Sequence, residues 1–152
     1  MSEQPGVLGR IRRLLARRVP ERLDITRSDL AVVVESFDDS EACSTALDRG
    51  AQDAPHWAES DDAVLRHHLE LPAEAVEEAL ALAGQDGYVA AAPPSPVSSE
   101  RPSEDGVTRV SLILQRVQLL DAMHCAQEKS RMASLAQRLG GDARGWDALQ
   151  PE

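Results

Sequence analysis

Aromatic residues are scarce in this sequence, whose 152 residues include two Trp, one Tyr and one Phe. A hydrophobic core must therefore be built from Leu, Val and Ala rather than from large rings. No apolar run of about 18 residues interrupts the chain and no signal peptide precedes it, which predicts a cytoplasmic protein without a membrane span. At this length we expect one core with appendages, because two half-sized domains would each be marginally stable.

Cysteine is also rare. Cys43 and Cys125 lie far apart in the sequence, and no secretory signal accompanies them. In a reducing compartment such residues are expected to be buried thiols, with a disulfide between them as the alternative.

The common nucleotide-binding motifs are missing. There is no G-x-G-x-x-G after a predicted strand, and the single lysine, Lys129, belongs to no phosphate-binding loop. His67 and His68 are neighbours on a predicted strand, so they point to opposite faces and cannot bind one metal ion together. We therefore expect no cofactor and no metal site.

A histidine-based active site would require its reactive side chains to lie close together in the fold. His124 and Cys125 are adjacent on a predicted helix and point in different directions, so a nucleophilic pair would need a distant partner such as His56. A catalytic site built from His56, His67 or His124 requires these residues to converge in one pocket. The sequence gives no sign of that convergence, and we expect a protein that is not an enzyme.

Negative charge is abundant, with a formal net charge of -10. An acidic body is repelled by phosphate, which argues against wholesale binding to nucleic acid or to an anionic membrane and favours a protein partner. The charge is uneven, since seven of the 16 basic residues fall within the first 28 positions.

Residues 1–28 are predicted to form a separate basic extension. Within residues 7–19 the apolar side chains share one helical stripe, and the arginines occupy much of the remaining surface. Pro20 then discourages continuation of the helix. We expect this segment to make a secondary electrostatic contact with the acidic body, with RNA or with a membrane surface, through Arg10, Arg12, Arg13, Arg17 and Arg18.

Residues 29–61 are predicted to add a strand and a helix. Residues 30–37 are rich in β-branched side chains, which is typical of a strand covered on both faces. A helix should follow, capped by Asp38, Asp39 or Ser40, and end at Gly50, before a loop that carries Trp57.

The sequence pattern of residues 62–149 predicts an α+β core. Leucines alternate with polar residues from residue 63, a helix with an acidic first turn follows Pro72, and residues 88–92 form a second strand. A mobile Pro/Ser-rich loop at 93–106 leads to a strand at 107–116, a helix reaching Leu139, and a short edge strand at 144–149. This order matches the ferredoxin-like split βαβ arrangement, in which two helices cover one face of a four-stranded antiparallel sheet. The added strand and helix of residues 29–61 either extend a sheet edge or form a lateral layer.

Two stretches resemble a known family. Residues 65–90 read LRHHLELPAEAVEEALALAGQDGYVA and residues 132–146 read MASLAQRLGGDARGW; together they are similar to the bacterial ribonuclease E inhibitor B family (RraB). The most specific positions are His67, His68, Gly87, Tyr88, Gly145 and Trp146. The resemblance covers a little over half of the chain and implies a ferredoxin-like fold that regulates the RNA-degrading endonuclease ribonuclease E by direct contact. The chain departs from the family in its basic extension, its added strand and helix, and its lack of a very acidic tail.

Two groups of residues are candidates for contact with a partner. Glu74, Glu77 and Glu78 form an acidic helix start, which is either a solvated surface or a site for an arginine-rich segment. Tyr88 and Trp146 each follow a glycine at the start of a strand, where a ring either covers the end of the core or anchors a partner.

The predicted function is that of a non-catalytic regulator that binds a protein, with ribonuclease E as the partner and RNA turnover as the process affected. The alternative is an RNA-associated, ribosome-associated or membrane-peripheral adaptor that uses the arginine-rich extension. The sequence leaves the oligomeric state open.

Overall fold

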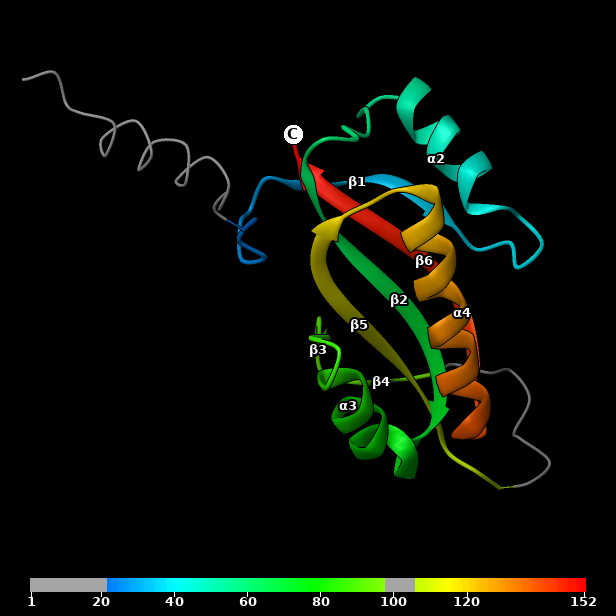
Figure 1. The fold of residues 1–152 in the computed structure, drawn as a ribbon. Helices are drawn as coiled ribbons and strands as arrows, with labels where there is room; N and C mark the ends of the chain where they lie inside the picture. The colour runs from blue at the N-terminus through cyan, green and yellow to red at the C-terminus, as the bar shows by residue number, and fades with distance from the viewer. Residues whose placement is uncertain (1–21, 98–105) are drawn as a thin grey trace, which may run out of the picture.

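A computed structural model describes residues 22–97 and 106–152 as an α+β fold (Figure 1). One antiparallel sheet of six strands has the spatial order β1-β6-β2-β5-β3, with β4 paired to β5. The strands are β1 (Leu30–Ser36), β2 (Asp62–Pro72), β3 (Val89–Ala90), β4 (Ser95–Pro96), β5 (Arg109–Leu119) and β6 (Asp142–Pro151). The α-helices are α2 (Cys43–Gln52), α3 (Val76–Gly84) and α4 (Ala122–Arg138), and one 3₁₀ turn (Ala73–Ala75) precedes α3. The predicted basic helix at 7–19 lies outside the described residues.

The added strand joins the sheet at its edge. β1 pairs with the outer side of β6, which decides between the two placements that the sequence left open. Because β1 takes that position, β6 lies inside the sheet between β1 and β2, and the predicted short edge strand at 144–149 is wrong in both length and place.

Helix α2 covers the free edge of β1. The guanidinium of Arg49 donates to the carbonyl oxygen of Glu35 at 2.9 Å. Gly50 lies so close to β1 that a Cβ atom there would be 2.8 Å from the carbonyl oxygen of Val33. The helix therefore does not end at Gly50, as its sequence predicts, but continues to Gln52, because the missing side chain serves packing rather than a helix stop. The expected polar cap is also absent, since Ala42 occupies the cap position.

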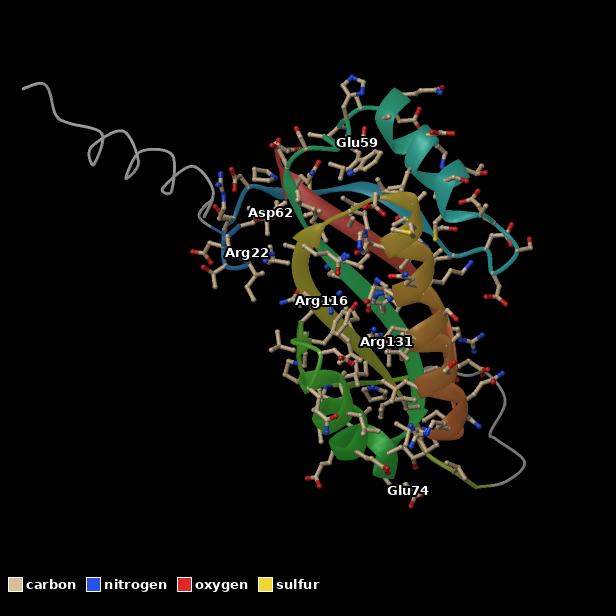
Figure 2. The ribbon with its side chains drawn as sticks, viewed as in Figure 1. Arg22, Glu59, Asp62, Glu74, Arg116 and Arg131 are labelled. Carbon is tan, nitrogen blue, oxygen red and sulfur yellow. The ribbon has the colours of Figure 1, made fainter. Side chains whose placement is uncertain are left out.

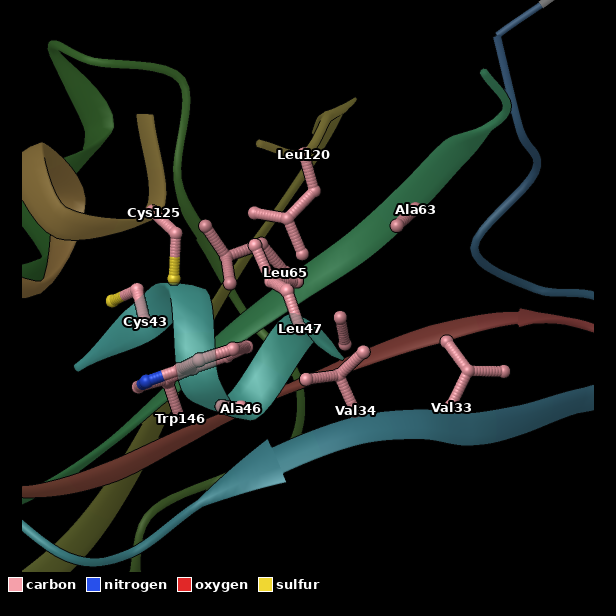
Figure 3. Close-up of a cluster of buried hydrophobic side chains, with 11 residues drawn as sticks. Val33, Val34, Cys43, Ala46, Leu47, Ala63, Leu65, Leu120, Cys125 and Trp146 are labelled. Atoms are coloured by element: carbon pink, nitrogen blue, oxygen red, sulfur yellow. The ribbon is translucent and has the colours of Figure 1, made fainter. Parts of the chain in front are cut away.

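All three helices lie on one face of the sheet (Figure 1). Odd-numbered residues of β2 from Ala63 to Leu71 point toward the helices and are buried. One apolar cluster joins α2 to β1, β6 and the first half of β2, and includes Leu47, Leu65 and Trp146 (Figure 3). A second joins α3 and α4 to β5 and the second half of β2. The opposite face of the sheet carries none of the described helices.

Two loops differ from their sequence predictions. Tyr88 precedes a strand of only two residues, because prolines at 93 and 94 follow soon after it. Part of the Pro/Ser-rich connection is bound to the sheet: Ser95 pairs with Ser111, and the backbone N–H of Val97 donates to the Arg109 carbonyl at 3.3 Å. Residues 98–105 of this connection lie outside the described residues.

The segment before β1 links opposite sides of the sheet. Arg22 donates to the carbonyl oxygen of Val117 on β5 at 3.3 Å, and the backbone N–H of Glu152 donates to Asp29 at 2.9 Å beside β1. Leu23 is half-buried between these points. Residues 22–28 are therefore attached to the sheet, although the sequence assigns them to a separate extension.

Among the described residues, no helix has the length and apolar character needed to cross a membrane.

Replacing Gly50 with Ala should destabilise the protein by about 1–3 kcal/mol, because the new methyl group would be 2.5 Å from a methyl group of Val34. Gly84 is the matched control, since a Cβ there meets nothing within 4 Å and Ala favours a helix. Gly84→Ala should be neutral or stabilising by up to about 1 kcal/mol. Urea unfolding of both variants measures the difference, and equal effects would contradict the close packing of α2 on β1.

Removal of residues 1–21 should leave the unfolding midpoint nearly unchanged, whereas removal of residues 1–29 should lower the unfolding free energy by about 1–3 kcal/mol. The longer deletion removes the Arg22 and Asp29 contacts and exposes the surface under Leu23. Thermal and urea unfolding of the two truncated chains test this, and equal stability would show that the segment does not hold the sheet.

Candidate functional site

Strand β2 carries two adjacent histidines that occupy opposite faces of the sheet. His67 points under the helices and is buried, between Leu65 of one apolar cluster and Leu69 of the other. His68 points to the opposite face, which carries none of the described helices and is called the helix-free face. Each histidine belongs to a separate network of polar side chains, and the alternation of a β-strand explains the separation.

The network under the helices is built around Glu128 of α4, which is only 6% exposed. The hydroxyl of Tyr88 donates to its carboxylate at 2.7 Å. The guanidinium of Arg116 on β5 forms an ion pair with the same carboxylate at 3.1 Å. Nε2 of His67 lies 3.4 Å from the Tyr88 hydroxyl. Arg116 of β5 and Tyr88, which precedes β3, thus bind one buried carboxylate of α4, and His67 of β2 reaches it through Tyr88.

The ring of Tyr88 is held from both sides. Arg116 lies over the ring at 4.5 Å from its centroid, and His67 meets it edge-on at 5.7 Å. Gly87, with φ of 85°, makes the turn that places Tyr88 after α3. Arg116 also donates to the Asp86 carbonyl at 2.8 Å, which fixes this turn against β5.

Burial changes the ionisation of this network. Desolvation and the hydrogen bond to Glu128 raise the pKa of Tyr88, so its hydroxyl remains protonated and able to donate. Desolvation lowers the pKa of His67 to about 4, which outweighs the opposing effect of Glu128. His67 is therefore neutral at pH 7.

The network on the helix-free face is centred on Asp147 of β6. Arg66 donates to its two carboxylate oxygens at 2.6 and 2.7 Å, and His68 lies 2.9 Å from it. Burial acts to raise the pKa of Asp147, but the hydrogen bonds from His68 and Arg66 lower it, and the net change is downward. His68 is thus hydrogen-bonded to a buried carboxylate on this face.

Phe37 lies on the same face and is 53% exposed. Its ring meets His68 edge-on at 5.1 Å. A Cβ atom on Gly145 would be 2.3 Å from the Phe37 ring and 2.7 Å from the Ser36 carbonyl oxygen, so only glycine fits beneath the ring. The missing side chain of Gly145 therefore leaves room for the exposed Phe37 ring to pack against β6.

Five of the six residues that carry the family resemblance are neighbours on or beside β2, and Gly87 lies in the turn before Tyr88. His67 pairs with Trp146 and His68 with Gly145 across β2 and β6, while Tyr88 contacts His67. Tyr88 and Trp146 are buried, so they cover the core, which is one of the two roles that the sequence leaves open for these rings. Glu74, Glu77 and Glu78 are exposed near the start of α3 (Figure 2, where Glu74 is labelled). The five arginines at 10, 12, 13, 17 and 18 lie outside the described residues.

The other reactive side chains are dispersed. His56 is exposed in the loop after α2, and His124 binds Asp121 at the first turn of α4. Cys43 and Cys125 are buried free thiols, and their side chains face each other between α2 and α4 (Figure 3). Burial and the contact with Cys43 raise the pKa of Cys125. Residues 22–97 and 106–152 contain no group of three or more His, Cys, Asp or Glu side chains arranged to hold a metal ion.

Sequence reasoning missed Glu128, Arg116, Asp147 and Phe37. One signal was present: Glu128 stands between Cys125 and Met132 on the apolar stripe of α4, where a charged side chain must find a partner. The partners could not be read from the sequence, because Arg116 comes from β5 and Tyr88 from the turn before β3.

Comparisons with protein-family models, with curated proteins and with solved structures give no match for this chain. The resemblance to the ribonuclease E inhibitor B family therefore stays a prediction.

The neutral state of His67 should make stability depend on pH. The unfolded chain binds a proton near pH 6.5 and the folded protein near pH 4, so stability falls as pH drops through that window, by up to about 3 kcal/mol. His67→Gln removes the titrating imidazole but keeps a polar group beside Tyr88. The loss of stability between pH 6.5 and pH 4 should therefore be absent from the His67→Gln variant. Urea unfolding from pH 7.5 to 4 measures the difference, with His56→Gln as the control for removal of an exposed histidine. Parallel curves for wild type and His67→Gln would contradict the buried neutral histidine.

Proposed function

We propose that this protein is a non-catalytic regulator that binds another protein through the helix-free face of its sheet. The observation that carries the proposal is the distribution of exposed apolar side chains. Of the six large apolar residues exposed in the described part of the chain, four are placed on this face by strand register or packing: Val32, Phe37, Val89 and Leu119. Because most of the exposed large apolar side chains lie on this face, it is the face that we assign to contact with a partner.

Phe37 is the best candidate for the main anchor of this surface. Aromatic side chains supply much of the binding energy at protein interfaces. Its ring is already positioned by Gly145 and His68, so binding would order little that is not ordered beforehand. His68, which contacts the ring, is itself hydrogen-bonded to Asp147, and Asp147 is also bound by Arg66.

The edges of the sheet favour a face contact over strand addition. Helix α2 covers the edge at β1, and the opposite side ends in strands of two residues each. A partner that uses the sheet is therefore expected to lie across its face rather than extend its hydrogen-bond ladder.

The partner we propose is ribonuclease E, with inhibition or modulation of RNA turnover as the outcome. Support comes from the sequence resemblance, and from a strand order β6-β2-β5-β3 that fits a ferredoxin-like split βαβ core with β1 and α2 added to it. The acidic side chains of Glu74, Glu77 and Glu78 would add long-range attraction to a basic segment of that enzyme. The protein would act by occupying a surface of the endonuclease, without chemistry of its own.

Binding of the full chain to purified ribonuclease E tests the proposal. Phe37→Ala should weaken binding by tenfold or more, because it removes the exposed ring from the apolar face. Met123→Ala is the matched control: Met123 is 62% exposed but lies on α4, on the other side of the sheet, and its change should alter affinity by less than about twofold.

The assay is titration calorimetry, together with cleavage of a defined RNA by the endonuclease. If ribonuclease E does not bind, the proposed partner is wrong. Binding that Phe37→Ala and Met123→Ala weaken to the same extent would overturn the choice of surface.

A further inference from the structure

Two buried polar side chains lack a hydrogen-bond partner on the helix side of the sheet, away from Phe37. They are Oγ of Ser36 and Nε1 of Trp146, in residues that are 6% and 1% exposed. Arg49 and Ser36 together lower the pKa of Glu41 to about 2, so the Ser36 hydroxyl lies near that carboxylate without forming a regular hydrogen bond. An unpaired indole N–H costs about 1–3 kcal/mol, and its position in a native fold calls for an explanation.

Both side chains line one narrow cavity between α4 and the end of β1. Ser36 and Trp146 are paired in register across β1 and β6, so they point the same way. The hollow measures about 340 Å³ including its open mouth, and its enclosed part is narrow. It admits a slender polar group and excludes a ring. Figure 3 shows the indole nitrogen of Trp146 at the margin of the apolar cluster.

The lining mixes charges of both signs. Lys129, Arg144, Asp38 and Asp39 lie around the cavity. Both cations are already engaged: Arg144 is ion-paired with Glu70, and the ammonium of Lys129 donates to the carbonyl oxygens of Asp39 and Glu41 at 3.1 and 3.2 Å. A carboxylate would therefore be repelled by Asp38 and Asp39 without gaining an unengaged cation. An ammonium group would have no acceptor to offer the indole N–H of Trp146.

His67 adds an acceptor to the same cavity. The Tyr88 hydroxyl donates its hydrogen bond to Glu128, so the contact between His67 and Tyr88 requires Nε2 of His67 to donate. In the neutral ring Nδ1 is then a hydrogen-bond acceptor. The cavity thus presents the Trp146 donor, the His67 acceptor and the Ser36 hydroxyl, which can act as either.

We propose that this cavity is a binding site for a primary carboxamide. The carbonyl oxygen of the ligand would accept from Nε1 of Trp146, and its NH₂ group would donate to Ser36 and His67. A carboxamide is neutral, planar and narrow, and it carries a donor and an acceptor side by side, as this mixed lining requires. The inference does not depend on the proposed function, since the cavity and Phe37 lie on opposite faces of the sheet.

The test is titration of the ¹⁵N-labelled full chain with acetamide, followed through the indole N–H resonances. We expect a saturable shift of the Trp146 resonance and no shift of Trp57, whose buried Nε1 is also unpartnered but lies outside this cavity. Acetate, which has nearly the same shape, should give no saturable shift. Ser36→Ala should weaken acetamide binding at least threefold, and Trp57→Phe assigns the remaining resonance.

A response to acetate equal to that of acetamide, no saturable response at all, or unchanged binding in Ser36→Ala would each overturn the proposal. Two further probes distinguish the source of the carboxamide. Tighter binding of free L-glutamine than of a blocked glutamine-containing peptide indicates a small-molecule ligand. The reverse order indicates a side chain of a protein partner.

Discussion

The carboxylate of Glu128 lies inside the helix–sheet interface, and the arrangement of the core depends on how it is neutralised. A buried charge without a partner costs several kcal/mol, so α4 can settle on the sheet only where Tyr88 and Arg116 reach it. Tyr88 precedes β3 and Arg116 lies on β5, and the network joins both to α4. The apolar side chains drive collapse, but they would tolerate small shifts of the helix along the sheet. The need to pair the buried carboxylate with Tyr88 and Arg116 fixes the position of α4 on the sheet.

His67 and Asp147 show how the sheet separates two polar environments. Under the helices, His67 is neutral and packs between two apolar clusters. On the other face, Asp147 stays ionised because Arg66 and His68 compensate for its burial. One face of the sheet is thus closed by helices and holds a narrow polar cavity. The other is open, has a rigid charged centre, and displays Phe37. The proposed protein contact and the proposed carboxamide site use these two faces separately.

Much of the order of elements could be read from the sequence, because local periodicity survives packing. The alternation at Leu65, His67 and Leu69 predicted β2, and it placed the two histidines on opposite faces. Predictions failed where a distant contact changed a local preference. Gly50 was expected to end a helix but packs on β1, and the 144–149 segment was expected at an edge but is covered by β1. The sequence indicated the residues of the candidate site that carry the family resemblance. It missed Phe37, because the exposure of this ring depends on the register of β1 with β6.

The sequence by itself determined the class of fold, the apolar stripe of each helix and the scarcity of large rings, because these follow from residue type and spacing of near neighbours. Only the tertiary structure decided which rings are buried and which side chains share a network. The sequence leaves a core role and a surface role open for Tyr88 and Trp146, and the helices cover both rings, while Phe37 remains exposed. The reason is physical: burial and hydrogen bonding in this sheet join residues as far apart as Arg66 and Asp147, and no local pattern encodes such a pairing.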